Sequence, residues 1–139
     1  MALKSEDLKF GEINEKTTVS KFNEYFKTNL IKNQQKFGVI DFFNEDKSIY
    51  LELKSRRINH DKFPTALIGM NKIKYLQKIN CNAYIGYKYD DGLFFIKYDK
   101  DLFNTFYLEK DYKRGYRADV GEEKSDVLHI PYTKLTKIN

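Results

Sequence analysis

Two apolar runs joined by a short polar segment constrain the fold of this chain more than any other feature. The runs are Phe37–Phe43 and Ile49–Ser55, and both contain the β-branched and aromatic residues that favour strands. The segment between them, Asn44–Ser48, consists of residues that are common in turns. The sequence therefore predicts a β-hairpin.

The register of this hairpin would bring two acidic side chains together. With a loop of four residues, 45–48, Phe43 pairs with Tyr50, and Asp41 lies opposite Glu52 on the same face of the sheet. Two carboxylates at that spacing repel each other by roughly 3 kcal/mol at an effective dielectric constant of about 20. Because a purely structural sheet has little reason to accept this repulsion, we expect the pair to bind a divalent cation such as Mg²⁺.

A lysine follows on the same side of the second strand. Tyr50, Glu52 and Lys54 alternate with Leu51 and Leu53, so the polar side chains should share one face and the leucines the other. Any half-buried strand gives the same alternation, and by itself it does not indicate a site.

The rest of the chain predicts a mixed α/β fold. The expected elements, in chain order, are a helix over Glu12–Thr28, a short strand over Leu30–Lys32, a polar stretch from Arg56 to about Thr65, a helix over Gly69–Ile79, a hairpin of Ala83–Tyr89 and Leu93–Tyr98, a turn at Asp111–Lys113, a strand over Val127–Ile130 and a final helical turn at Pro131.

Composition limits the kinds of protein that this can be. A chain of 139 residues fits one domain, and 41% hydrophobic residues exclude a disordered chain. No apolar run approaches the roughly 18 residues that cross a bilayer, the first ten residues lack the pattern of a secretory signal, and the single cysteine cannot form an internal disulfide. We expect a cytoplasmic protein (or one of a host-cell interior, if viral) that is not secreted and has no membrane partner. A net charge of +5 is compatible with nucleic-acid binding without establishing it.

A third acid is a candidate for the same site. Glu15 lies on the apolar face of the predicted first helix, with Val19, Phe22 and Phe26, so it should point into the protein, where a carboxylate needs a partner. Glu12 is the alternative, but its place at the helix start is explained by the helix dipole. We favour Glu15.

Asp41 followed by Glu52-Leu53-Lys54, with Gly11 and a helix that carries Glu15 before them, resembles the PD-(D/E)XK nuclease superfamily. The resemblance implies a restriction-endonuclease-like core, a mixed sheet flanked by helices in the order αβββαβ, over about residues 10–98, with 99–139 as a C-terminal extension. Ile40 stands where the family motif has proline. The run Lys54–Lys72 is similar to small nuclease-like proteins of large DNA viruses and phages.

The resemblance also implies roles for these residues. Asp41, Glu52 and the main-chain carbonyl of Leu53 would bind Mg²⁺ or Mn²⁺, and Glu15 would complete a second-metal or outer-shell site. Lys54 would orient the attacking water or offset negative charge in the transition state.

Basic side chains around this motif are candidates for gripping phosphates. They follow the motif strand or open the second predicted helix, and they are Arg56, Arg57, His60, Lys62 and Lys72. An exposed charged surface is the competing interpretation for each. Tyr87 and Tyr89 share a strand face and could stack on bases.

The expected function is therefore a metal-dependent endonuclease that acts on DNA with low sequence specificity. One set of metal ligands should cut one strand at a time, so a double-strand break would need a homodimer or a second encounter. The alternative is a non-catalytic module with the same fold, which binds nucleic acid or another protein. The sequence leaves open DNA against RNA as the substrate.

Overall fold

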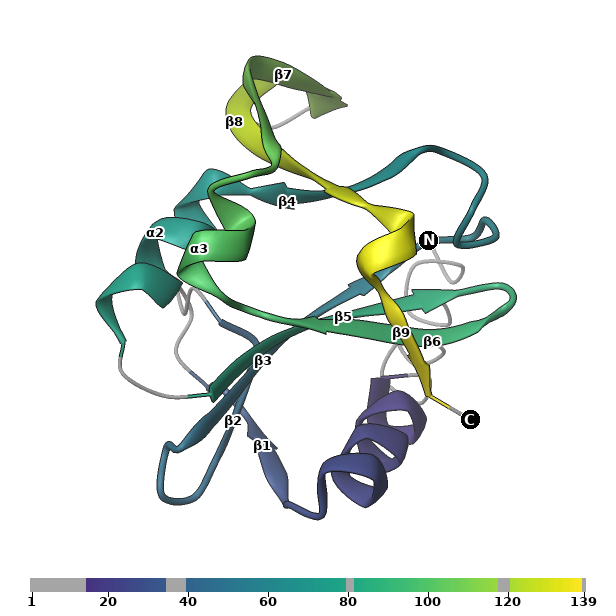
Figure 1. The fold of residues 1–139 in the computed structure, drawn as a ribbon, viewed down its shortest axis with the longest axis vertical. Helices are drawn as coiled ribbons and strands as arrows, with labels where there is room; N and C mark the ends of the chain where they lie inside the picture. The colour runs from purple at the N-terminus through teal and green to yellow at the C-terminus, as the bar shows by residue number, and fades with distance from the viewer. Residues whose placement is uncertain (1–14, 35–39, 80–81, 118–120, 139) are drawn as a thin grey trace.

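The computed structural model describes residues 15–34, 40–79, 82–117 and 121–138, and it is a strand-rich mixed α+β fold (Figure 1). An N-terminal helix covers residues 15–26. The other elements are β1 (Leu30–Lys32), β2 (Phe42–Asn44), β3 (Ile49–Ser55), β4 (Thr65–Gly69), α2 (Met70–Lys78), β5 (Asn82–Tyr89), β6 (Gly92–Lys97), α3 (Lys100–Phe103), β7 (Tyr107–Arg117), β8 (Gly121–Pro131), the 3₁₀ turn η1 (Tyr132–Lys134) and β9 (Thr136–Ile138).

The main sheet has six strands in the order β1-β2-β3-β5-β6-β9. All neighbours in it are antiparallel except β3 and β5, which are parallel and pair from Ile49 opposite Asn82 to Ser55 opposite Lys88. A parallel pair needs a crossover, and the chain makes it through β4 and α2. The sheet therefore has both parallel and antiparallel pairs, and the chain has the mixed fold of helices and strands that the sequence predicted.

The predicted hairpin has the expected register. β2 and β3 are antiparallel, and Phe43 pairs with Tyr50. Its loop is closed by a hydrogen bond from the Lys47 N–H to the Asn44 carbonyl (2.9 Å), with Lys47 at a φ of 58°. The β-ladder begins at Phe42, so Asp41 lies one residue before the strand. Residues 37–39 of the first predicted run lie outside the described residues.

The N-terminal helix covers one face of this sheet. Its Val19 and Phe22 are buried and share a core with Leu51 on β3. Phe22 lies so close to β5 that a Cβ on Gly86 would come within 2.7 Å of its ring. The apolar positions that predicted this helix face are thus confirmed.

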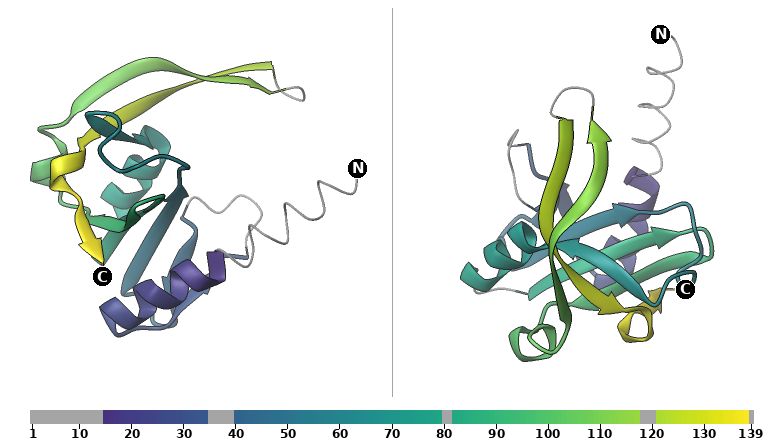
Figure 2. Two further views of the ribbon diagram at one scale, coloured as in Figure 1. Left: turned by 90° about the vertical axis from the view of Figure 1, so that its right-hand side faces the viewer. Right: turned by 90° about the horizontal axis from the view of Figure 1, so that it is seen from above.

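The other face carries a second layer, made of α2 and a three-stranded sheet in the order β4-β8-β7. Ile73 and Leu76 of α2 pack in this layer with Ile68 of β4 and Ile130 of β8. Figure 2 shows the long hairpin of β7 and β8 arching over β4 and projecting beyond the main sheet. The segment expected as an extension, 99–139, contributes both this hairpin and the edge strand β9.

Two expectations about local structure were wrong. Thr65–Gly69 is a strand, where the sequence suggested only the end of a polar stretch, because pairing with β8 from Thr65 opposite Pro131 to Gly69 opposite Val127 stabilises it. Asp111–Lys113 lies inside β7 and does not form a turn between elements. The turn-like residues instead produce a bulge there, with Asp111 at a φ of 56° and a shift in the register with β8.

Candidate functional site

Glu52 is the central residue of the candidate site, and the alternation of β3 determines where its side chain points. Leu51 and Leu53 pack on the face covered by the N-terminal helix, so Glu52 and Lys54 point to the opposite face, toward the second layer. There the Glu52 side chain is only 2% exposed. A carboxylate buried to this extent needs compensating partners.

Two lysines supply part of that compensation. The ammonium nitrogens of Lys54 and Lys72 lie 3.2 and 3.3 Å from the same oxygen of Glu52, Oε2. Lys54 comes from the same strand and Lys72 from the first turn of α2, so the crossover between β3 and β5 brings the second lysine to the site. The other oxygen, Oε1, is buried and has no hydrogen-bond partner among the described residues.

Asp41 completes the acidic pair. Its Oδ2 accepts a hydrogen bond from the Leu53 N–H at 3.0 Å, so the carboxylate is fixed against the main chain of β3 beside Glu52. The main chain on either side is also held, because the Asn33 N–H donates to the Asp41 carbonyl at 2.7 Å and the Asn33 side chain donates to the Ile40 carbonyl at 3.1 Å. Asn33, the residue after β1, thus positions the main chain of an acid that lies outside the β-ladder.

The electrostatics of the site oppose the charge that Glu52 carries. Burial raises the pKa of the Glu52 carboxyl above its ordinary value, and the nearby Asp41 carboxylate raises it further. The ammonium groups of Lys54 and Lys72 act in the opposite direction without cancelling the rise. The ionised carboxylate is therefore less stable here than in water, and an added cation would relieve this cost.

Glu15 lies elsewhere than expected. The sequence predicted a buried acid, whereas the Glu15 side chain is 36% exposed and forms an ion pair with Lys32 on β1 at 3.0 Å. The helix that carries it packs on the face of Leu51 and Leu53, opposite to the face of Glu52. No described contact joins Glu15 to Glu52, and its role as a metal ligand stays a prediction. The alternative acid, Glu12, lies outside the described residues.

The basic candidates separate into different environments. Lys72 lies within the site, while Arg56, Arg57 and Lys62 are exposed. Arg56 is held by its main chain, whose N–H donates to the Lys88 carbonyl, and its guanidinium donates to the Ser55 carbonyl, each at 2.9 Å. Their contacts with phosphates stay predictions.

His60 is engaged within the protein. Its main-chain N–H donates to Asp91 Oδ1 at 2.9 Å, its ring nitrogen Nδ1 contacts Asp91 Oδ2, and its ring stacks on Phe94 with centroids 4.4 Å apart. This arrangement joins the loop after β3 to the β5–β6 turn. His60 therefore has a structural role that requires no contact with a phosphate.

Sequence reasoning missed a second group of possible ligands around this histidine. His60, Asp61 and Asp91 have ligand atoms that all lie within 4.8 Å of one another. Asp91 is 31 residues from His60, so no local spacing could have indicated the group. Because the His60 ring already contacts Asp91, the group has a structural role without an ion.

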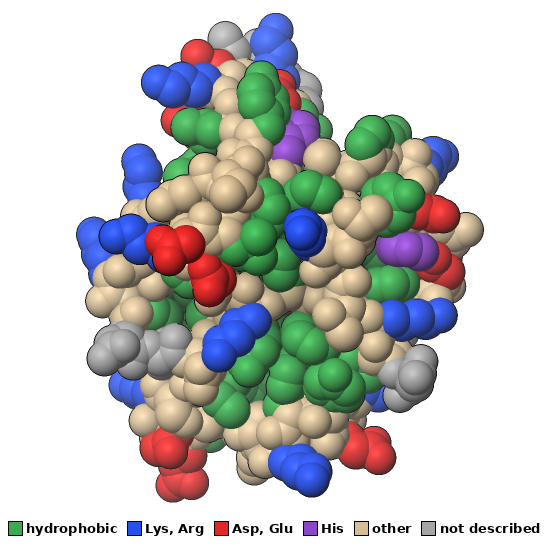
Figure 3. All heavy atoms as spheres, viewed as in Figure 1, with side chains coloured by type: hydrophobic (Ala, Val, Ile, Leu, Met, Phe, Trp, Pro, Cys, Tyr) green, Lys and Arg blue, Asp and Glu red, His purple; other side chains and the backbone are tan. Residues whose placement is uncertain are grey.

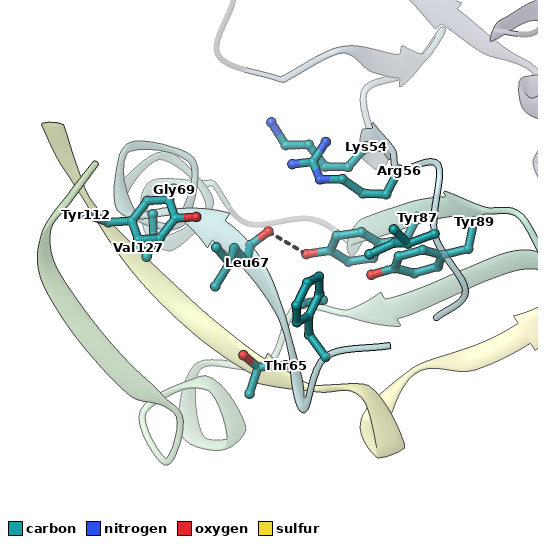
Figure 4. Close-up of a pocket in the computed structure, with 12 residues that line it drawn as sticks. Lys54, Arg56, Thr65, Leu67, Gly69, Tyr87, Tyr89, Tyr112 and Val127 are labelled. Atoms are coloured by element: carbon teal, nitrogen blue, oxygen red, sulfur yellow. Dashed lines mark hydrogen bonds between the residues drawn. The ribbon is translucent and has the colours of Figure 1, made fainter. Parts of the chain in front are cut away.

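A cavity of about 350 Å³ adjoins the Glu52 site and shares Lys54 with it. Figure 4 shows Lys54 and Arg56 side by side at one side of the cavity, with Tyr87 and Tyr89 next to each other on β5 and Tyr112 on the opposite wall. The Tyr87 hydroxyl donates to the Leu67 carbonyl at 3.0 Å. The cavity therefore combines cationic and aromatic groups.

The distribution of charge on the surface is a weaker indication of nucleic-acid binding than the site itself. Figure 3 shows Lys and Arg side chains scattered between acidic ones on the face seen in Figure 1, so the positive charge does not form one field on that face. Among the described residues, no helix combines the length and the apolar character needed to cross a membrane.

The comparisons with known proteins supply no relative. No protein-family model matches the chain, and no match was found among curated proteins or among solved structures.

Proposed function

We propose that the protein is a metal-dependent nuclease that hydrolyses phosphodiester bonds in DNA, with Asp41, Glu52 and Lys54 at its centre. The single observation that carries the proposal is the Glu52 carboxylate, which is buried with one oxygen lacking a hydrogen-bond partner among the described residues. Asp41 lies beside it and two lysines bind its other oxygen. Oxygen ligands that converge from neighbouring strands suit a hard divalent cation.

The order of elements supports the resemblance to the PD-(D/E)XK superfamily. The N-terminal helix, β1, β2, β3, α2 and β5 follow one another with antiparallel pairing through β3 and a parallel pairing of β3 with β5. One departure is β4, which lies between β3 and α2 and pairs in the second sheet. We propose a restriction-endonuclease-like core with this insertion.

The residues of the site fit Mg²⁺ or Mn²⁺. Asp41 and Glu52 offer carboxylate oxygens and Leu53 a main-chain carbonyl, and the bound ion would neutralise charge on the scissile phosphate. Lys54 would orient the attacking water and offset the negative charge on the phosphoryl oxygens in the transition state. Lys72 would hold Glu52 in place through its ion pair and keep the carboxylate ionised.

Cleavage of supercoiled plasmid tests this function. With Mg²⁺ or Mn²⁺, the protein should nick the plasmid, and open circles should appear before linear DNA, because one chain carries one set of ligands. EDTA should stop the reaction. Asp41→Asn, Glu52→Gln and Lys54→Met should each lower the rate by at least about 100-fold, a typical effect of losing a catalytic group. Lys74→Met, on an exposed lysine of α2, is the control.

Several outcomes would reject the proposal. These are equal rates in all four variants, cleavage in EDTA, or no cleavage of any DNA substrate with either metal. Linear fragments that form at once without a nicked intermediate would contradict the single-strand step.

One observation favours a second candidate, a non-catalytic nucleic-acid-binding module. Glu52 Oε2 already forms ion pairs with Lys54 and Lys72, and such a pairing suits a domain that uses no metal. Titration with Mn²⁺ separates the two candidates, since a module of this kind should bind no ion at Asp41 and Glu52 and should not cleave DNA when the ion is added.

A further inference from the structure

The cavity beside Glu52 has a composition that the hydrolytic chemistry does not require. It lies between the main sheet and the second layer, and β3, β5, β4, β7 and β8 all contribute to its wall. Its volume, about 350 Å³, falls at the lower end of the range of roughly 300–1,000 Å³ for small-ligand sites.

One side of the cavity is cationic. Lys54 and Arg56 both line it and lie next to each other (Figure 4). The Arg56 guanidinium interacts electrostatically with Tyr89 on β5. Burial raises the pKa of Tyr89, and the positive charge of Arg56 opposes that rise. A phosphate bound near Lys54 would thus have a second cation beside it.

The rest of the cavity is largely aromatic. Tyr87 and Tyr89 stack with centroids 5.7 Å apart and are only 1% and 7% exposed, so this pair forms a fixed wall and offers no free ring face. The two tyrosines share a strand face, as expected, but the expectation that they stack on bases was wrong because both are buried. The accessible rings are Phe63, which is 55% exposed, and Tyr112, which comes from the projecting β7–β8 hairpin and is half-buried.

We propose that this cavity receives one unpaired nucleobase of the DNA strand whose phosphate lies at Lys54, with Phe63 and Tyr112 as the rings on which the base stacks. Cations beside stacking rings are the combination that binds single-stranded nucleic acid. The inference rests on the proposed function and deepens it, because it names the substrate class: a strand with at least one nucleotide outside the duplex.

A paired base does not satisfy this site. Within a duplex both faces of a base are covered by its neighbours, and only its edges reach the grooves, so stacking on a protein ring requires a base that has left the stack. The cavity lies between two layers, and its volume of about 350 Å³ has room for a single base and not for a double helix. Single strands, frayed ends, flaps and the locally unpaired stretches that negative supercoiling favours in a plasmid provide such a base.

Binding in EDTA tests the inference without any cleavage. The probes are a fluorescein-labelled single-stranded DNA oligonucleotide and a labelled blunt duplex closed by G·C pairs at both ends, and binding is followed by fluorescence anisotropy. The parent should bind the single strand more tightly. Phe63→Ala and Tyr112→Ala should each weaken single-strand binding by about 5- to 150-fold, the range that corresponds to loss of one base–aromatic stack, and should change duplex binding less than about twofold.

Tyr107→Ala is the matched control, because Tyr107 lies on the same strand as Tyr112, is 67% exposed and is not part of the cavity wall. It should change neither affinity. Circular dichroism and the unfolding midpoint establish that each variant folds, and Phe63, exposed in a loop, keeps the test valid if Tyr112→Ala unfolds.

The inference is overturned if the parent binds duplex as tightly as single strand, or if Phe63→Ala binds the single strand like the parent. A protein that never cleaves DNA but shows the expected pattern would overturn the nuclease function alone and leave the base site in place.

Discussion

Replacement of Lys72 by methionine should raise the pKa of Glu52. Methionine keeps most of the length of the lysine side chain and removes the charge. At the observed 3.3 Å and an effective dielectric constant of about 20, the attraction between Lys72 and Glu52 amounts to about 5 kcal/mol. Lys54 remains at 3.2 Å and relaxation will recover part of the loss. We therefore expect a net rise of at least about one pKa unit, which corresponds to about 1.4 kcal/mol.

Carbon-13 NMR of the Glu52 carboxyl against pH, without divalent metal, measures this directly. Lys74→Met is the control, since Lys74 is exposed on the same helix and its removal changes the net charge equally. The reasoning is refuted if the Glu52 midpoint is the same in Lys72→Met, Lys74→Met and the parent.

Stability should change with pH in the corresponding direction. The folded pKa of Glu52 is raised above its unfolded value, so Glu52 reduces stability as pH rises through the interval between the two values. Lys72→Met enlarges that interval. Its destabilisation in urea should therefore be small near pH 4 and grow toward neutral pH, and a difference that is independent of pH would contradict the assignment.

Two further predictions concern packing and binding. Gly86→Ala should destabilise the fold by about 1–3 kcal/mol in urea denaturation, because the new Cβ would lie 2.7 Å from Phe22, and Phe22→Leu in the same chain should recover part of the loss; a neutral Gly86→Ala would refute the packing. Arg56→Ala and Arg57→Ala should each weaken DNA binding for all sequences and reduce its salt slope by up to about one phosphate contact, whereas an unchanged slope would assign these arginines to the solvated surface.

Local periodicity was sufficient for the parts of the fold that are stabilised locally. The bounds of β1 and β3, the register of Phe43 with Tyr50 and the buried face of the N-terminal helix all follow from residue spacing. The proximity of Asp41 to Glu52 follows from the same register, because only a short loop separates their strands.

The parts of the fold and of the site that could not be predicted from the sequence depend on contacts between residues far apart in the chain. β7 contains a charged and bulged stretch around Asp111 that has no alternation of its own, and it is a strand because β8 pairs with it. The contact of Lys72 with Glu52 depends on the crossover through α2. The sequence suggested Lys72 as a phosphate-binding residue, whereas in the structure it lies against the buried acid. Glu15 was expected to be buried because it shares the apolar face, but Lys32 on the neighbouring edge strand holds it half-exposed.

The central claim is that Asp41 and Glu52 hold a divalent cation, and isothermal titration calorimetry with Mn²⁺ tests it most directly. The account predicts that the parent binds at least one ion, that Glu52→Gln abolishes this binding, and that Asp61→Asn, in the separate group with His60 and Asp91, leaves it unchanged. Binding that survives Glu52→Gln and is lost in Asp61→Asn would contradict the account and move the metal to the other group.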